Sequence, residues 1–257
     1  MSTPDYDVVV IGSGFGGSVM TCRLAEKGYS VCLLERGGQY GFANFPRHTS
    51  EGDRFFWDPV DGSYGLYDFN VFPRSDASIV CASGLGGGSL VYANVLMKVP
   101  ADFFKAWPGG ITREVMDPYY ETVLQMMEAS PYPYESDPYY TDTPKTAALN
   151  EAFQGLDPSP GGGSPQWVLP KLAIRFKGQF PGAQSLNNQG KIQSRCTKCG
   201  ECVAGCNIQA KNTLDLNYIA RAENPDLLGE TGQAAAVKTN AEVFDVVPEG
   251  VEGYTVH

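Results

Sequence analysis

The stretch DYDVVVIGSGFGGSVMTCRLAEKGYSVCLLERGG, residues 5–38, decides the fold of this chain. It begins with an apolar segment over residues 6–11 and continues through a glycine turn into small and apolar residues with helical character. A second apolar segment over residues 30–34 follows and is closed by an acid, Glu35. Strand, glycine turn, helix and strand in this order predict a βαβ half-unit, and therefore the α/β class with parallel strands and covering helices.

Three glycines of the turn, Gly12, Gly14 and Gly17, have the spacing G-x-G-x-x-G. Gly12 permits the tight turn, Gly14 lets the backbone approach a pyrophosphate, and Gly17 allows helix and strand to pack closely. The helix N-terminus adds unpaired N–H groups and a positive dipole end. Glu35 stands where a carboxylate accepts from the ribose hydroxyls of an adenosine, and its charge disfavours the 2′-phosphate of NADP. A plain glycine-rich turn is the alternative, but strand, helix and acid agree on dinucleotide binding.

Length and charge limit the class of protein. A chain of 257 residues predicts one or two domains. The balance of 19 basic against 29 acidic side chains gives a net charge of −10 without a cluster of Lys and Arg, which argues against a nucleic-acid surface. No apolar run reaches the ~18 residues of a membrane-spanning helix, so no transmembrane segment is expected. The N-terminus resembles no signal peptide, and a cytoplasmic protein is therefore expected.

A second glycine run lies in IVCASGLGGGSLVYANVLMKVP, residues 79–100. A short apolar strand leads into Gly84, Gly86, Gly87 and Gly88, followed by Ser89. Four glycines in five positions leave the backbone free to lie against a ligand. A flexible linker is the alternative. The apolar residues on both sides favour a second contact with the same cofactor.

Four cysteines form a cluster in CTKCGECVAGC, residues 196–206. Their spacing, C-x2-C-x2-C-x3-C, is that of the bacterial ferredoxin run, although Asn207 replaces the usual proline and no second run is present. In a chain without a secretion signal, such cysteines favour metal ligands or thiols over disulfides. An iron–sulfur cluster (4Fe–4S) is the first hypothesis, structural zinc the second and free or redox-active thiols the third. The expected metal ligands are Cys196, Cys199, Cys202 and Cys206.

The first glycine loop, Glu35-Arg36-Gly37 and the run GLGGGSLVYANVLMKVP together resemble the glucose–methanol–choline (GMC) oxidoreductase family, and within it the branch like cholesterol oxidase. The resemblance implies a Rossmann-like FAD/NAD(P)-binding domain that holds FAD. It places the first loop at the pyrophosphate, the acid at the adenosine ribose and the second loop along the pyrophosphate and flavin. One departure is Tyr92, which stands where many members have an asparagine. The implied FAD contacts are Gly12, Ser13, Gly14, Phe15, Gly16, Gly17, Glu35, Arg36, Gly84, Gly87, Gly88, Ser89, Asn94, Val95 and Val243.

The resemblance also implies a domain plan. Residues 1–100 are expected to be the first part of the FAD-binding domain, and residues 101–190 part of an α+β substrate or cap region. Residues 191–257 are expected to hold the cysteine-rich loop and the return to the FAD-binding domain. Since members of the family continue for a similar length again, the chain is expected to be a truncated, N-terminal portion.

The implied activity is FAD-dependent oxidation of the CH–OH group of an alcohol, with sterols among the candidates, by hydride transfer to the flavin. The electron acceptor is expected to be oxygen, a partner protein or a quinone. No catalytic acid or base is assigned, because neither histidine has a recognisable catalytic context. One alternative is a non-catalytic FAD- and metal-binding fragment or electron-transfer module that needs a C-terminal half. Another is an NAD-dependent dehydrogenase, for which no second fingerprint is present.

Periodicity predicts further elements. Asp117 followed by Pro118 predicts the start of a helix that reaches about Ala129. Alternation over residues 172–176 predicts a half-buried strand. Residues 210–220 predict a helix capped by Asn212 or Thr213. The remaining expectations are two surface loops, residues 130–144 and 157–165, and three strands, residues 234–237, 241–247 and 254–256.

Overall fold

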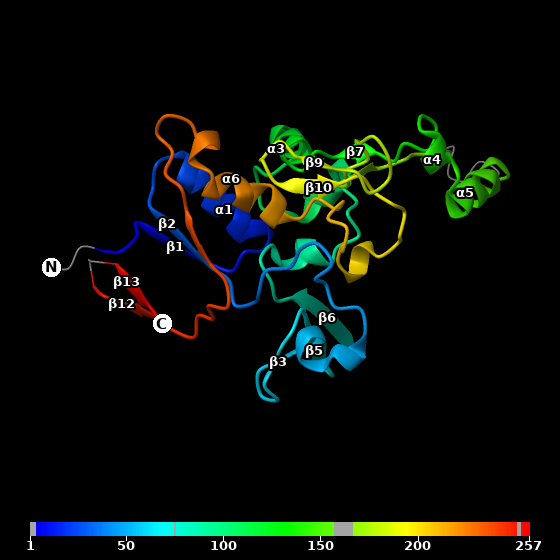
Figure 1. Ribbon diagram of the computed structural model, residues 1–257. Helices are drawn as coiled ribbons and strands as arrows, with labels where there is room; N and C mark the ends of the chain where they lie inside the picture. Colours follow the sequence, from blue (N-terminus) through cyan, green and yellow to red (C-terminus); the bar gives the residue numbers. More distant parts are fainter. Residues whose placement is uncertain (1–3, 75, 157–166, 251–252) are drawn as a thin grey trace. The chain divides into compact units, whose positions relative to one another are not determined.

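The computed structural model describes residues 4–74, 76–156, 167–250 and 253–257. Its chain divides into two compact units (Figure 1). Unit 1 consists of Met1–Asn94 and Lys177–His257, and unit 2 of Val95–Phe176. The described residues contain no helix with the length and apolar character that crossing a membrane requires.

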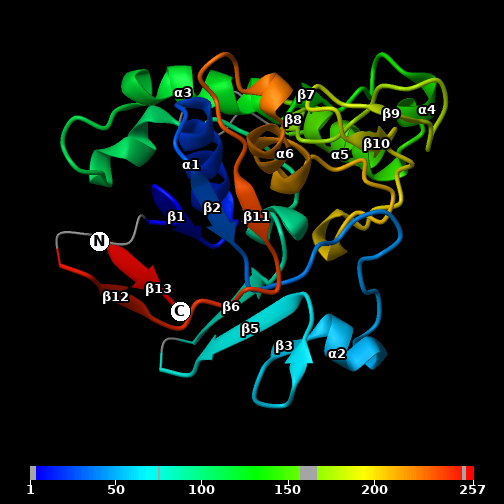
Figure 2. The same ribbon diagram turned by 60° about the vertical axis from the view of Figure 1, so that its left-hand side comes forward.

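A three-stranded parallel sheet forms the centre of unit 1 (Figure 2). Its strands are β1 (Val8–Ile11), β2 (Val31–Leu34) and β11 (Ala236–Lys238), in the order β1-β2-β11. The strand β2 lies in the middle, and its residues Val31, Cys32 and Leu33 are buried as the apolar sequence predicts. The α/β fold class with a parallel βαβ unit is thus confirmed.

Two helices, α1 (Phe15–Glu26) and α6 (Tyr218–Glu223), pack against each other beside the sheet. Small side chains on α1 permit the close approach, since its buried residues are Ser18, Thr21, Cys22 and Ala25. An ion pair of 2.6 Å between Arg221 of α6 and Glu26 of α1 closes the end of this contact. The two helices therefore hold the N-terminal crossover and the segment after the cysteine loop in one body.

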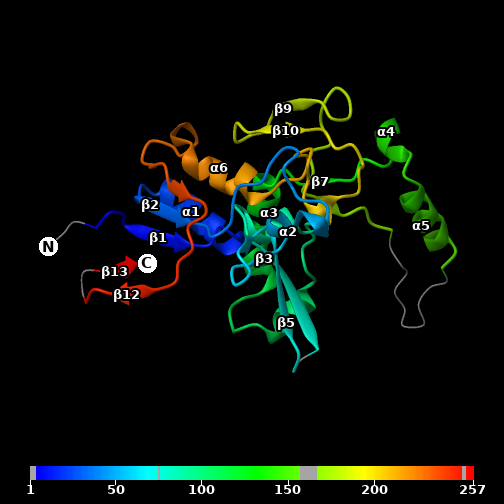
Figure 3. The ribbon, with the colours of Figure 1, turned by 60° about the horizontal axis from the view of Figure 1, so that its bottom comes forward.

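Unit 1 also contains antiparallel hairpins, and the longest among the described residues pairs β5 (Tyr67–Phe72, labelled in Figure 3) with β6 (Ala77–Ala82, labelled in Figure 2). Tyr67 joins Phe45, Leu66 and Leu90 in an apolar cluster that ties this hairpin to the second glycine run. The 3₁₀ helix η2 (Gly87–Leu90) is the next element after β6. The other elements of unit 1 are η1 (Thr49–Glu51), α2 (Gly52–Phe55), β3 (Trp57–Asp58), β4 (Ser63–Tyr64), β9 (Gln184–Leu186), β10 (Ile192–Ser194), η4 (Cys202–Ala204), η5 (Leu214–Leu216), η6 (Pro225–Leu227), β12 (Val246–Pro248) and β13 (Tyr254–Val256).

Unit 2 is built around the helix α3 (Arg113–Met126) and a cluster of three aromatic rings. The rings of Tyr132, Tyr140 and Phe176 meet edge to face at centroid distances of 5.2–5.6 Å. Part of the expected loop at residues 130–144 is helical, whereas residues 157–165 lie outside the described residues. The other elements of unit 2 are η3 (Ala101–Ala106), β7 (Ser130–Pro131), α4 (Pro138–Thr141), α5 (Pro144–Gln154) and β8 (Lys171–Leu172).

The predicted start of α3 at Asp117 is wrong. The helix begins four residues earlier, at Arg113, because the Thr112 side chain accepts from the N–H of Val115 and caps it. Asp117 instead accepts from Lys98 at 3.0 Å and from Arg113 at 2.9 Å. Pro118 is accommodated inside the helix.

Four other boundaries also differ from the prediction. The helix expected from residue 210 begins only at Tyr218, because the Asn217 side chain accepts its N–H at 2.8 Å and residues 214–216 form a 3₁₀ turn. The strand expected over residues 172–176 is reduced to Lys171–Leu172, and that expected over residues 241–247 begins at Val246. The strand expected over residues 234–237 begins two residues later, at Ala236–Lys238, whereas the strand at residues 254–256 agrees with the prediction.

Candidate functional site

A cleft of about 470 Å³ opens in unit 1 where β1 and β2 end. In parallel α/β sheets, ligands bind outside the carboxyl ends of the strands. The first turn of α1 also begins here and carries N–H groups without intrahelical partners. The lining residues are Ile11, Gly12, Ser13, Gly14, Leu34, Glu35, Arg36, Val80, Cys81, Ala82, Gly87, Gly88, Ala241, Glu242 and Val243.

The first glycine loop has the geometry that its spacing predicts. Gly12 has a φ of +86°, and its N–H donates to the carbonyl of Leu34 at 2.8 Å. A Cβ atom on Gly17 would lie 1.9 Å from the carbonyl oxygen of Gly12, so only glycine permits this packing. Gly14 and Gly16 have nothing within 4 Å of the corresponding position. The loop is thus closed on its protein side and open at Gly14 and Gly16.

The second glycine loop lies directly against the first. A Cβ atom on Gly87, whose φ is +52°, would come within 2.7 Å of the Cα atom of Gly14. The Ser13 hydroxyl accepts from the N–H of Gly86 at 2.9 Å and lies 3.3 Å from the carbonyl oxygen of Gly84. Two loops about seventy residues apart in sequence therefore form one backbone surface at the cleft.

Glu35 holds the first glycine loop at its base. Its carboxylate accepts from the Ser13 N–H at 3.0 Å, the Ser13 hydroxyl at 2.5 Å and the Gly37 N–H at 2.9 Å. Only 5% of the residue is exposed. A carboxylate offers about four acceptor positions, so one remains for a further donor.

Two residues expected at the cofactor, Arg36 and Ser89, make contacts with the protein around the loops. The Arg36 guanidinium pairs with Asp68 at 2.5 Å and lies over the ring of Trp57. Ser89 is buried, donates to the carbonyl of Gly86 at 2.7 Å and accepts from the N–H of Leu214 at 3.0 Å. Arg36 still lines the cleft, whereas Ser89 and Gly84 do not.

The other expected FAD contacts divide into two groups. Val243 lines the cleft. Phe15 packs edge to face on Tyr92 at 5.9 Å, and Asn94 is buried with a φ of +59°. Val95 belongs to unit 2 and pairs with Leu172 there. Phe15, Asn94 and Val95 are not among the residues that line the cleft.

Sequence reasoning missed one wall of the cleft. Val80, Cys81 and Ala82, the last residues of β6, line it together with Ala241 and Glu242. Val80 and Cys81 are exposed, which is unusual for apolar residues in a strand. Their position just before the second glycine run was the available signal.

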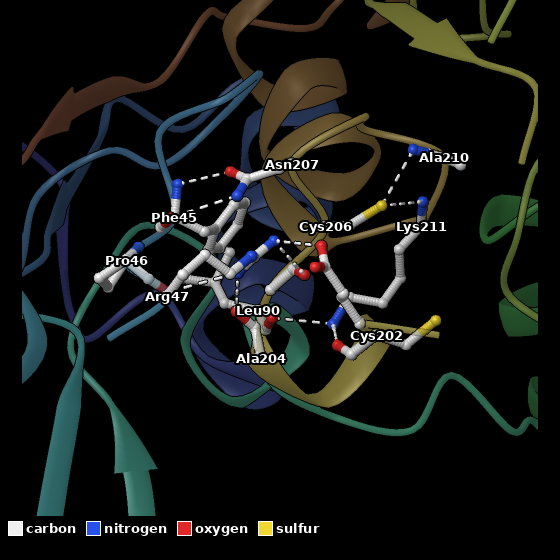
Figure 4. Close-up of polar contacts among 12 residues, drawn as sticks. Phe45, Pro46, Arg47, Leu90, Cys202, Ala204, Cys206, Asn207, Ala210 and Lys211 are labelled. Carbon is white, nitrogen blue, oxygen red and sulfur yellow. Dashed lines mark hydrogen bonds and ion pairs between the residues drawn. The ribbon is translucent and has the colours of Figure 1, made fainter. Parts of the chain in front are cut away.

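The cysteine-rich loop forms a polar network with neighbouring segments (Figure 4). The Cys206 sulfur accepts from the N–H groups of Ala210 at 3.2 Å and Lys211 at 3.4 Å. The Lys211 ammonium donates to the carbonyl oxygens of Leu90 at 2.8 Å, Tyr92 at 3.3 Å and Cys202 at 2.5 Å. Burial lowers the pKa of Lys211 to about 8.

The predicted four-thiol metal centre is not formed in the structure. Searching the residues that the structure describes finds no group of three or more His, Cys, Asp or Glu placed to hold a metal ion. The four cysteines carry no disulfide, and their exposure ranges from buried Cys206 to exposed Cys199. Protein thiols have no mutual attraction that would bring four of them to a common point.

The parallel βαβ unit and the two glycine loops at its cleft define a dinucleotide-binding protein of the Rossmann type. A family model described as NAD(P)-binding Rossmann-like domain matches residues 10–58. Over 263 aligned residues the chain is 32% identical to a cholesterol oxidase of Acinetobacter baumannii, covering 98% of this chain and 44% of that protein. A cholesterol oxidase of Mycobacterium tuberculosis is 34% identical over 232 residues, covering 86% of this chain and 38% of that protein.

The chain belongs to the GMC oxidoreductase family, as its motifs predict. This membership supports FAD as the dinucleotide. A solved structure of a fungal aryl-alcohol oxidase has a TM-score of 0.49 and 16% identity to the chain, covering 98% of this chain and 41% of that one. The chain spans less than half the length of these relatives.

Proposed function

We propose that this chain binds FAD and forms the dinucleotide-binding part of an oxidoreductase that oxidises the CH–OH group of an alcohol. The observation that carries the proposal is the direct contact of the two glycine loops, where Gly87 approaches the Cα atom of Gly14, beside a cleft at the carboxyl ends of β1 and β2. The 32% identity to a cholesterol oxidase over 98% of the chain supports the same assignment.

The residues present fit the cofactor. Gly14 and Gly16 present open backbone at the start of α1, which suits a pyrophosphate. Glu35 keeps one acceptor position for the adenosine ribose. Gly87 and Gly88 line the same cleft and would lie along the remainder of the cofactor. Val243 contributes an apolar wall.

FAD, when bound, supplies the acceptor for the hydride that leaves the carbinol carbon of the substrate. The task of this chain's residues is to bind and orient that group. The two histidines lie away from the cleft lining: the His48 N–H is held by Glu51, and His257 packs on Phe244. Neither is assigned a role in removing the hydroxyl proton.

For the substrate class we propose a bulky alcohol such as a sterol, because two relatives that match most of the chain are named cholesterol oxidases. Oxygen, a partner protein or a quinone would accept the electrons. The experiment is an FAD titration of the purified 257-residue chain, followed by visible absorbance. Anaerobic addition of cholesterol or a long-chain alcohol then tests whether the bound flavin is reduced. Bound FAD that no alcohol bleaches would favour the non-catalytic module, and a colourless chain indifferent to FAD would contradict the proposal.

A matched pair of variants sharpens the titration. Gly14 has a φ that ordinary residues adopt and open space at its Cβ position, so a side chain there enters the cleft without disturbing the fold. Gly14→Asp places a negative charge at the expected pyrophosphate, and we expect more than a tenfold loss of FAD affinity. Gly14→Asn has the same shape without the charge and should lose less. Equal affinities for both variants would place the phosphates elsewhere.

A further inference from the structure

The cysteine-rich loop, residues 196–206, has no role in the proposed flavin chemistry. Its hydrogen bonds to sulfur, a buried lysine beside it and its backbone conformation are nevertheless unusual. We propose that Cys196, Cys199, Cys202 and Cys206 together bind a thiolate-preferring metal centre, either a zinc ion or an iron–sulfur cluster, and that the buried Lys211 balances its negative charge. Four thiolate ligands are the donor set that both centres share.

Hydrogen bonds to sulfur provide the first support. Cys206 accepts two backbone N–H groups, from Ala210 at 3.2 Å and Lys211 at 3.4 Å, and Cys196 accepts one from Lys198 at 3.4 Å. A neutral thiol is only a weak acceptor, whereas hydrogen bonds to an ionised group are stronger. Backbone donors aimed at two of the four sulfurs therefore prepare the loop for thiolates.

The environment of Lys211 provides the second support. The residue is 1% exposed, and its ammonium group donates to three carbonyl oxygens, all of them neutral. Among the described residues Lys211 forms no ion pair, and the Asp215 carboxylate acts on it only from beyond ion-pair distance. Buried charges in proteins are normally paired or coordinate metals. A divalent ion with four thiolates carries net negative charge and would supply a closer anionic partner than Asp215, beside Cys202.

Backbone conformation provides the third support. Lys198 has a φ of +58° and Gln209 a φ of +51°, conformations that L-residues rarely adopt, and Gly200 and Gly205 also have positive φ. Strained positions of this kind cluster at ligand-binding sites. On the other side, the Arg47 guanidinium donates to the carbonyls of Ala204 and Gly205 and anchors the loop. The backbone is thus held from two sides, and rotation of the cysteine side chains is the movement that would bring the sulfurs together.

The experiment measures metal directly and does not depend on flavin or activity. The full chain is purified anaerobically from cells supplied with zinc and iron, and zinc, iron and acid-labile sulfide are quantified per chain. Stoichiometric zinc identifies the single ion, and iron with matching sulfide identifies the cluster. Absence of both, together with failure to take up added Zn²⁺ or to be reconstituted with iron and sulfide, would overturn the proposal.

Variants keep the test specific. Cys199 is exposed, so Cys199→Ser removes one ligand without opening a cavity, and we expect metal retention to fall at least tenfold. Cys81→Ser removes an exposed thiol outside the loop and should retain the metal. Lys211→Met should weaken metal retention by about 10- to 100-fold, as loss of an outer partner usually does, whereas Lys211→Arg should lose less. Equal metal content in wild type and Cys199→Ser would also contradict the four-cysteine site, even if Lys211→Met failed to fold.

Discussion

The first glycine loop and the cysteine-rich loop are both short runs with strict spacing, but the structure realises them differently. In the glycine loop, Gly17 meets the carbonyl of Gly12 and Gly87 meets Gly14, so the chain alone completes the arrangement. In the cysteine loop, the donors and anchors are in place while the four sulfurs do not converge on a common point. A motif that acts through excluded volume is completed by folding, whereas one that acts through ligation needs its ligand.

The largest effect that tests this comparison is expected at Gly17. A Cβ atom there would lie 1.9 Å from the Gly12 carbonyl oxygen. That oxygen belongs to the backbone and Gly17 lies within α1, so neither can easily move away. We expect Gly17→Val to lower the free energy of unfolding by more than about 3 kcal/mol, the upper range for overpacking. Urea denaturation of the chain without cofactor measures it.

Gly16 is the matched control for Gly17. It lies one residue earlier in the same helix, and nothing lies within 4 Å of its Cβ position. Gly16→Ala should change the free energy of unfolding by no more than about 1 kcal/mol, and alanine's helix propensity favours an increase. Similar losses at both positions would show that the close approach at Gly17 does not shape the loop.

A second effect concerns Asp215, which lies behind the second glycine loop, near Gly86. Burial raises the pKa of Asp215 from 3.8 to about 6, so the folded state binds the proton more tightly than the unfolded chain. Its contribution to stability is therefore present below pH 3.8 and lost as the pH rises to about 6. Two units of pKa shift correspond to about 3 kcal/mol.

Asp215→Asn removes this titration. We expect the variant to gain up to about 3 kcal/mol relative to wild type at neutral pH, and to lose the slope of stability between pH 4 and 6. Urea denaturation across that pH range measures both. A wild-type stability that does not fall over this window would mean that the carboxyl group is solvated, and that the second loop is packed less tightly than the first.

The third effect compares two glycines with positive φ, one packed closely against backbone and one in open space. Gly87 has a φ of +52° and Gly190 a φ of +75°, but only Gly87 has backbone within 3 Å of its Cβ position. Gly190→Ala should cost about 1 kcal/mol, the left-handed penalty alone. Gly87→Ala should cost about 2 kcal/mol and should also weaken FAD binding, because it pushes the two loops apart. Equal losses in stability with unchanged FAD affinity would contradict the contact between the loops.

A contrast between local and distant contacts also explains which features could be predicted from the sequence. The βαβ unit and both glycine loops were predictable, because glycine spacing and apolar runs act over a few residues. The start of α3 was not predictable, because the carboxylate of Asp117 accepts a hydrogen bond from Lys98, nineteen residues earlier in sequence, and does not cap the helix. The cleft wall formed by Val80, Cys81 and Ala82 was missed for a related reason, since their exposure depends on how the hairpin lies against the sheet.

The smallest effect concerns the rim of the cysteine-rich loop, where Glu201 pairs with Arg47 at 3.0 Å. The Glu201 side chain is 45% exposed, and exposed pairs usually contribute less than about 1 kcal/mol. Arg47 keeps its bonds to the carbonyls of Ala204 and Gly205 when Glu201 is changed. We therefore expect Glu201→Gln to lower the free energy of unfolding by about 0.5 kcal/mol, and by less at high salt.

Asp102→Asn, which removes the more exposed pair with Lys105, is the control, and its loss should be smaller still. Denaturation of both variants at low and high salt measures the difference. A loss well above 1 kcal/mol at Glu201 would mean that side-chain contacts of the chain fix the cysteine loop as firmly as backbone packing fixes the glycine loops. The four sulfurs would then have little freedom to converge, and the distinction between a loop completed by folding and one completed by its ligand would fail.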